Sequence, residues 1–85
     1  MYYTYFIESQ RNYKVYVGYT NKKPLERLKD HNSGKNKYTN NNKPFKLLYY
    51  EEFNCKQDAM LKEKFYKTGF GKRIKKAIIS EVAGR

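Results

Sequence analysis

Glu63 is the first residue in this sequence whose surroundings point to chemistry. In a segment of helical periodicity, at about 100° per residue, it shares an arc with Ala59, Met60 and Tyr66. A carboxylate on a partly apolar helix face loses solvation energy unless it pairs with a cation or binds a metal ion. Glu63 is therefore a candidate metal ligand. The alternative is an ordinary ion pair with one of three nearby lysines, Lys62, Lys64 and Lys67.

A second pair of candidates, Arg27 and His31, lies four residues apart in another helical segment. Residues at this spacing share one helix face, which is offset from the inward face that we expect for Leu25 and Leu28. A face carrying a guanidinium and an imidazole can look into a cleft. Taken singly, Arg27 is also explained as a solvated cation, and His31 as a helix-end residue that the helix dipole favours.

Tyr5 and Tyr16 lie in two segments rich in β-branched and aromatic residues, which predict the adjacent strands of a hairpin. A tyrosine hydroxyl donates hydrogen bonds and, once deprotonated, takes up a proton. Cross-strand aromatic packing is the alternative explanation of this pair. Gly18 lies inside the second of these strands, where glycine usually marks the close approach of another group.

The elements that must position these residues are three strands and three helices. We predict strands over residues 2–8, 14–20 and 45–53, and helices over residues 24–32, 55–67 and 72–82. Pro24 suits the first turn of a helix, and Asn54 with Gln57 resembles a capping box. Both hairpin strands carry apolar groups on both faces, so helices should cover the sheet on both sides.

The expected fold is therefore α+β (an α/β sandwich). It has a three-stranded antiparallel sheet flanked by about three helices, in the order β-β-α-β-α-α. The 85 residues are enough for one domain, residues 1–85. Residues 34–44 are basic and rich in asparagine, with Tyr38 in the middle, and this composition predicts an exposed loop.

Composition narrows the class of partner. The chain has 19 Lys and Arg against 8 Asp and Glu, and a net charge of +11. This excess favours a polyanionic partner, with simple solubility as the alternative. One cysteine and one histidine exclude a Cys/His zinc site, which takes about four ligands. No run approaches the ~18 apolar residues of a membrane span, so we expect a cytoplasmic protein without a membrane partner.

Taken in their order along the chain, these residues resemble the GIY-YIG nuclease family. The motifs are Tyr3-Thr4-Tyr5, Tyr16-Val17-Gly18, the helical Arg27 and the later Glu63. The resemblance covers nearly the whole chain. It is closest to compact stand-alone members and to the amino-terminal nuclease domain of the incising component of excinuclease ABC. The stretches YVGYT, RLKDHNSGK, and KYT followed by PFKLLYYEEF are typical of that compact group.

The resemblance implies five catalytic residues and one metal ion. Tyr5 and Tyr16 would line one cleft, where one of them acts as the general base toward water; the sequence leaves open which one. Arg27 would steady the charge on the phosphate, and His31 would transfer a proton or contact the phosphate. Glu63 would hold a single Mg²⁺ or Mn²⁺ ion, which keeps several of its waters.

The chain departs from the family pattern at two positions. Tyr19 stands where a lysine often follows the second motif, and we expect Lys22 or Lys23 to replace that cation. Many members also have an asparagine after the last helix, and residues 72–85 contain none. The expected contacts to nucleic acid come from the basic segments: Lys22, Lys23, Lys35, Lys37, Tyr38, Lys43, Lys72 and Arg73.

The resulting hypothesis is a metal-dependent endonuclease that hydrolyses phosphodiester bonds, in DNA rather than RNA. Because no sequence-reading module is visible, selectivity should come from the shape of the substrate or from an accessory repair protein. Such an enzyme would serve DNA repair or recombination. The alternative is a non-catalytic DNA- or RNA-binding module of the same fold, and a protein-interaction role for the tyrosine-rich surface is a third.

Overall fold

The chain folds into a three-stranded sheet with helices on both faces, and the computed structural model describes residues 1–84. The elements are β1 (Tyr2–Ser9), β2 (Val15–Thr20), α1 (Pro24–Asn32), the 3₁₀ turn η1 (Asn40–Asn42), β3 (Phe45–Phe53), α2 (Lys56–Phe65) and α3 (Gly69–Ala83). The predicted α+β fold and its order β-β-α-β-α-α are confirmed. Arg85, the last residue of the predicted domain, lies outside the described residues.

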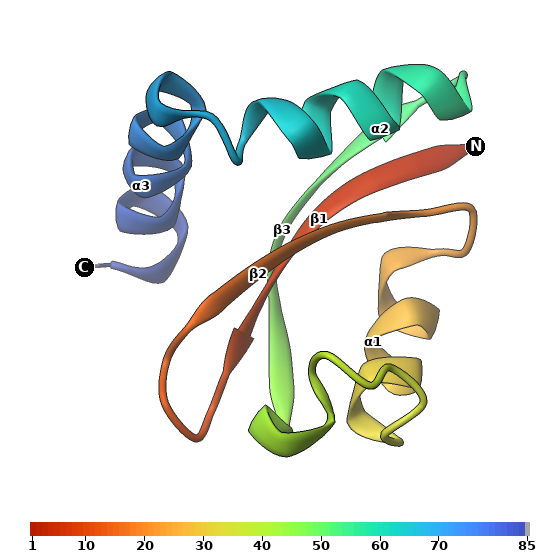
Figure 1. Ribbon diagram of the computed structural model, residues 1–85, viewed down its shortest axis with the longest axis vertical. Helices are drawn as coiled ribbons and strands as arrows, with labels where there is room; N and C mark the ends of the chain where they lie inside the picture. Colours follow the sequence, from red (N-terminus) through yellow and green to blue (C-terminus); the bar gives the residue numbers. More distant parts are fainter. Residues whose placement is uncertain (85) are drawn as a thin grey trace.

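The sheet is antiparallel with strand order β2-β1-β3, so β1 is central and β2 is an edge strand. Tyr5 lies opposite Gly18 on β2 and opposite Tyr50 on β3. Successive side chains of a strand point to opposite faces. The odd-numbered residues of β1 therefore face α1, and the even-numbered ones face α2 and α3. Figure 1 shows α1 with the following loop on one side of the sheet and α2 and α3 on the other.

The face toward α1 carries a small apolar core. Tyr5, Ile7 and Phe45 are buried together, and Leu28 of α1 packs against them, as predicted. The prediction for Leu25 was wrong, because 64% of its surface is exposed. Buried polar residues on α1 take the inward positions instead. They are Asp30 and His31, both of which lie beside the candidate site.

The opposite face is anchored by aromatic packing and by hydrogen bonds. Phe6 is fully buried, and its ring centroid lies 4.8 Å from that of Tyr66 in an edge-to-face contact. The Tyr66 hydroxyl donates to Glu51 of β3. Thr4 donates its hydroxyl to the Ala59 carbonyl oxygen at 2.7 Å, which ties β1 to α2. These contacts fix the helix that carries Glu63.

Two helix starts differ from the prediction. The N-cap of α2 is Cys55, without a side-chain hydrogen bond, so the capping box expected at Asn54 is absent. The α3 helix begins at Gly69, three residues before the predicted start. Here Thr68 is the cap, and its hydroxyl oxygen accepts the Gly71 N–H at 3.0 Å. Within residues 1–84, no helix has the length and apolar composition needed to cross a membrane.

The loop between α1 and β3 is less exposed than its composition predicted. Thr39 has only 3% of its surface exposed, and Asn42 is half-buried. Ser9 at the end of β1 donates its hydroxyl to the Asn42 carbonyl oxygen at 2.6 Å. Tyr38, by contrast, is 90% exposed. Part of this polar loop therefore packs against the sheet and contributes to the site below.

Candidate active site

His31, near the end of α1, is buried and hydrogen-bonded at both ring nitrogens. Its Nε2 lies 2.8 Å from the Tyr5 hydroxyl oxygen, and its Nδ1 lies 2.8 Å from Thr39 Oγ1. The Thr39 hydroxyl donates to the Asn36 carbonyl oxygen at 3.5 Å. Because that donation leaves Thr39 as an acceptor for His31, we assign the proton of the neutral imidazole to Nδ1. The Tyr5 hydroxyl then donates to Nε2.

The electrostatic surroundings keep both members of this pair neutral near pH 7. Burial and the positive charge of Arg27 lower the pKa of His31 to about 4. Burial also raises the pKa of Tyr5 above its usual range, although the neighbouring Arg27 guanidinium opposes the increase. Tyr5 is therefore held as a neutral hydrogen-bond donor to a neutral imidazole.

Gly18, opposite Tyr5 on β2, leaves the space that the Tyr5 side chain fills. A Cβ atom at Gly18 would lie 2.5 Å from the Tyr5 hydroxyl oxygen and 2.7 Å from its Cζ. Both distances are well below an ordinary van der Waals contact of about 3.5–4.0 Å between carbon atoms. The close approach that this glycine predicted is thus made by Tyr5.

Tyr16 lies on the same face of the sheet, but its hydroxyl has a different kind of partner. Its ring packs edge-to-face on Phe45, with the centroids 5.5 Å apart. Asn42 Nδ2 donates to the Tyr16 hydroxyl oxygen at 2.7 Å. The Tyr16 oxygen is therefore an acceptor, whereas the Tyr5 hydroxyl is a donor.

The orientation of the Asn42 amide follows from a chain of hydrogen bonds that begins at the backbone. The Lys14 N–H donates to Asn12 Oδ1 at 3.0 Å, so the Asn12 amide turns its NH₂ group outward. Asn12 Nδ2 in turn donates to Asn42 Oδ1 at 2.8 Å. Because a backbone N–H is always a donor, this chain leaves the NH₂ group of Asn42 facing Tyr16.

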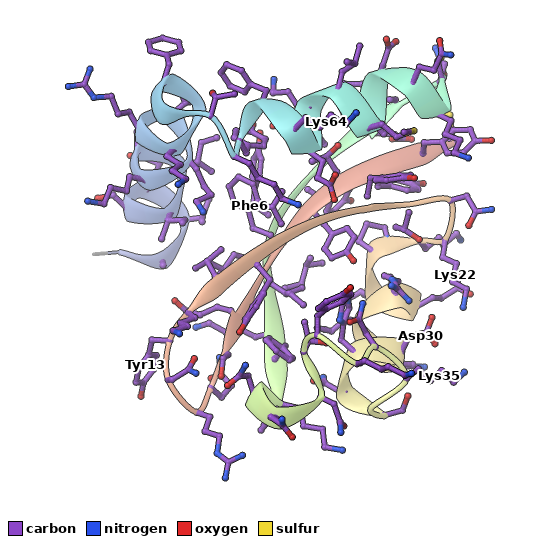
Figure 2. All side chains as sticks on the ribbon, viewed as in Figure 1. Phe6, Tyr13, Lys22, Asp30, Lys35 and Lys64 are labelled. Atoms are coloured by element: carbon purple, nitrogen blue, oxygen red, sulfur yellow. The ribbon has the colours of Figure 1, made fainter. Side chains whose placement is uncertain are left out.

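Arg27 belongs to a cluster of cations around one buried carboxylate. Its Nη1 lies 3.5 Å from Asp30 Oδ2. The Nζ atoms of Lys22 and Lys35 lie 2.6 Å and 3.5 Å from the same carboxylate. Figure 2 shows Lys22, Asp30 and Lys35 together beside α1. The hydrogen bond from Lys22 is the main reason that the pKa of Asp30 is lowered. Three cations around one carboxylate leave this corner positive.

Glu63 reaches the same region from α2. Its Oε2 lies 3.6 Å from Lys67 Nζ, one helical turn later, so the ion pair considered for Glu63 does form. Glu63 also lines a cavity of about 370 Å³ along the edge strand β2. All five residues expected to be catalytic line this cavity: Tyr5, Tyr16, Arg27, His31 and Glu63.

The donor set in the cavity fits a divalent ion held by one protein carboxylate. Glu63 supplies a half-buried carboxylate there, beside the two tyrosine hydroxyls. Among residues 1–84, no group of three or more His, Cys, Asp or Glu side chains is placed to hold a metal ion. A hard ion such as Mg²⁺ accepts this arrangement, because it keeps several waters and takes other oxygens from a phosphate.

The residues expected to contact nucleic acid are distributed unevenly. Tyr38 lines the cavity, and Lys22 lines an adjacent cleft together with Arg27. Lys35 reaches Asp30. The other five do not line the cavity: Lys37 is exposed, Lys43 contacts Asn40, Lys23 begins α1 beside Tyr50, and Lys72 and Arg73 are exposed on α3.

Three side chains of the site were not predicted as functional. Lys67 lines the cavity, and its position four residues after Glu63 is a visible signal on a helix. Thr39 sets the tautomer of His31, and Asn42 contacts Tyr16. Both of these lie in the polar loop, and their contacts span 8 and 26 residues of sequence, so no local pattern marks them.

The fold and this cavity define a nuclease-type domain, and comparison with known proteins identifies the family. The model of the GIY-YIG catalytic domain matches residues 1–76, and the chain belongs to this family. GIY-YIG nucleases generally use a divalent metal ion and act on nucleic acid.

Small UPF0213 proteins are among the relatives of this chain. It is 44% identical over 64 residues to one from Bacillus licheniformis, a match that covers 74% of this chain and 65% of that protein. It is 50% identical over 54 residues to one from Streptococcus agalactiae serotype V, which covers 62% of this chain and 60% of that protein. The chain thus spans less than two thirds of these two relatives.

Another relative matches over nearly its whole length. A UPF0213 protein from Staphylococcus haemolyticus is 38% identical over 80 residues, or 93% of this chain and 94% of that protein. No solved structure matches the chain.

Proposed function

We propose that this protein is a divalent-metal-dependent endonuclease that hydrolyses phosphodiester bonds in DNA. The observation that carries the proposal is the convergence of five side chains from four elements on one cavity. They supply two hydroxyls, a guanidinium, a neutral imidazole and a carboxylate. Phosphodiester hydrolysis requires an activated water, stabilisation of charge on the phosphoryl oxygens and assistance to the leaving oxygen.

Tyr16 is the general base in this proposal. Its oxygen accepts the Asn42 N–H, and a hydrogen bond to an oxygen that becomes negative favours the charged form. Tyr5 is unsuited to this role, because burial raises its pKa and its proton is directed at His31. The attacking water gives its proton to the Tyr16 oxygen while its own oxygen forms the new bond to phosphorus.

The remaining residues orient the water and stabilise charge. Tyr5, held by neutral His31, accepts a hydrogen bond from the water and directs it toward the phosphorus. Arg27 faces the phosphoryl oxygens, on which negative charge grows as the P–O bond to the leaving oxygen breaks. Glu63 holds the divalent ion, which when bound neutralises charge on the phosphate and at the leaving oxygen.

The biological setting belongs to the same proposal. The net charge of +11 supports a grip on the phosphate backbone. We infer that DNA is preferred over RNA, that selectivity comes from substrate shape or an accessory repair protein, and that the enzyme acts in cytoplasmic DNA repair or recombination. Mg²⁺ and Mn²⁺ are the ions to test.

The proposal is tested by plasmid nicking with matched variants. Supercoiled plasmid and flapped DNA are incubated with the protein in Mg²⁺ or Mn²⁺, and nicked product is measured on gels. Glu63→Gln and Tyr16→Phe should each lose at least 100-fold in rate while DNA binding persists. Glu81→Gln and Tyr50→Phe, at exposed positions away from the cavity, should retain full activity.

Two results contradict the proposal. Equal nicking by the wild-type protein and Glu63→Gln would assign the activity to a contaminant. DNA binding without nicking in either metal would instead support the non-catalytic binding module of the same fold.

A further inference from the structure

A second hollow adjoins the cavity where β2 leads into α1. Its volume is about 530 Å³, within the range of about 300–1,000 Å³ that is usual for ligand pockets. Tyr19 and Arg27 line both hollows. A ligand that occupies the second hollow can therefore continue into the candidate active site.

This hollow, which we call the Tyr2–Tyr19 cleft, has an aromatic wall. Tyr19 lies opposite Thr4 in the antiparallel register, and Tyr2 is two residues from Thr4 on the same strand face. Tyr2 and Tyr19 are thus diagonal neighbours of the kind that long side chains can bridge. Both are half-buried, so their rings have a fixed position and an accessible surface.

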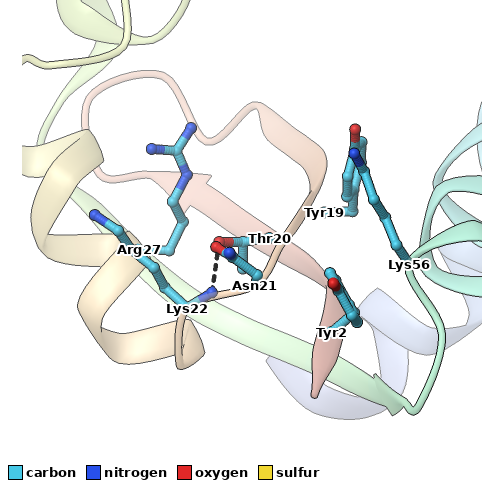
Figure 3. Close-up of a pocket in the computed structure, with 7 residues that line it drawn as sticks. All are labelled: Tyr2, Tyr19, Thr20, Asn21, Lys22, Arg27 and Lys56. Atoms are coloured by element: carbon cyan, nitrogen blue, oxygen red, sulfur yellow. Dashed lines mark hydrogen bonds between the residues drawn. The ribbon is translucent and has the colours of Figure 1, made fainter.

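Cations complete the cleft. Figure 3 shows Tyr2, Tyr19 and Lys56 on one side and Lys22 and Arg27 on the other. Lys56 is exposed at the first residue of α2. Among the described residues, those that line this cleft include three cations and no carboxylate. Aromatic rings beside cations, with no nearby acid in the lining, match the chemistry of a nucleotide: a flat base and an anionic phosphate.

We propose that the Tyr2–Tyr19 cleft binds one unpaired nucleotide next to the scissile phosphate. The base lies against Tyr19 and Tyr2, and the flanking phosphates contact Lys22, Arg27 and Lys56. Because a base within a duplex has no free face to offer, the substrate class is DNA with a single-stranded segment, such as a flap or a frayed end. Stacking of this type tolerates any base. The placement beside the scissile bond rests on the proposed function, whereas binding of the nucleotide does not.

The experiment is a binding measurement without divalent metal, so that cleavage plays no part. A fluorescent oligothymidylate of eight nucleotides is compared by anisotropy with an abasic oligomer of the same length and charge. The wild-type protein should bind the oligothymidylate at least fivefold more tightly. In Tyr19→Leu this preference should fall below twofold. The matched control Tyr50→Leu, at an exposed tyrosine on β3 outside the cleft, should retain it.

A charge variant separates the phosphate contacts from the base contact. Lys56→Gln should weaken the binding of both oligomers by a similar factor of two to five, and the logarithmic salt dependence should become shallower by about 0.7. Equal affinity of the wild-type protein for the two oligomers would overturn the proposal, as would an undiminished preference in Tyr19→Leu. A protein that never cleaves DNA but shows a Tyr19-dependent preference for bases would overturn the proposed function and leave this inference supported.

Discussion

The two tyrosines of the cavity differ, at the scale of single residues, in the direction of their hydrogen bonds. Tyr5 donates to a histidine that burial keeps neutral. Tyr16 accepts from an amide whose orientation is set through Asn12 by the backbone N–H of Lys14. Two residues of the same type therefore have different chemistry, because their partners differ.

Asn42 provides a direct test of this difference. In Asn42→Ala the oxygen of Tyr16 loses its donor, so negative charge on it is less stabilised. We expect the rising limb of the pH–rate profile for plasmid nicking to move about one pH unit higher, with a roughly tenfold loss of rate at pH 7. Asn41→Ala, at an exposed neighbouring position, is the control and should leave the profile unchanged. An unshifted profile in Asn42→Ala would remove Tyr16 from the role of base.

His31 should make the stability of the protein depend on pH. Its pKa of about 4 in the folded protein lies below the value of about 6.5 in an unfolded chain. Between these two values the unfolded state binds more protons, so the free energy of unfolding falls as the pH decreases from 6.5 to 4, by roughly 3 kcal/mol. Above pH 6.5 this contribution is complete and constant.

Urea denaturation followed by circular dichroism at pH 7.5, 6, 5 and 4 measures this effect. In His31→Gln the loss of stability between pH 6.5 and 4 should be smaller by about the same amount. Asp30, whose pKa is lowered, contributes stability that is lost only as the pH falls below about 3.8, so the two windows are separate. Parallel curves for wild-type protein and variant would show that His31 is not the titrating group.

At the scale of elements, the pairing of β1 with β2 controls the position of Tyr5. In Gly18→Ala the added methyl group overlaps the Tyr5 ring, which is buried and has no empty space to enter. We expect a loss of about 1–3 kcal/mol in the free energy of unfolding and at least a tenfold loss of nicking, because the hydrogen bond to His31 is broken.

The chain offers a matched glycine for this experiment. A Cβ atom at Gly69, the first residue of α3, meets no atom within 4 Å. Gly69→Ala should therefore change stability by less than 1 kcal/mol and leave the nicking rate unchanged. An equal loss of stability in the two variants would mean that the effect at Gly18 reflects β-strand backbone entropy rather than contact with Tyr5.

At the scale of the whole molecule, the elements of the fold were largely predictable from local pattern. The β3 strand has the predicted bounds 45–53, because its aromatic and β-branched composition is uninterrupted. The start of α3 was not predicted, because its glycines resemble a linker. Gly71 belongs to the helix instead, where a side chain would collide with the Phe65 carbonyl oxygen.

The candidate site was predictable to the extent that its residues follow the family's motifs. The five residues of the cavity were all proposed from the sequence, and the structure places them on one cavity. Thr39 and Asn42 were not, because asparagine and threonine in a polar loop look like solvent-exposed residues. Their burial depends on contacts with β1, β2 and α1 that only the folded chain brings together.

Those two loop residues are also close to each other. The Asn42 N–H donates to the Thr39 carbonyl oxygen at 3.0 Å, so both belong to one turn. That turn holds the tautomer of His31 at one end and the donor to Tyr16 at the other. When it opens by local unfolding, both tyrosines lose their partners in the same event. The cavity therefore assembles as one cooperative unit, and the loop that closes it acts on both tyrosines as a single control.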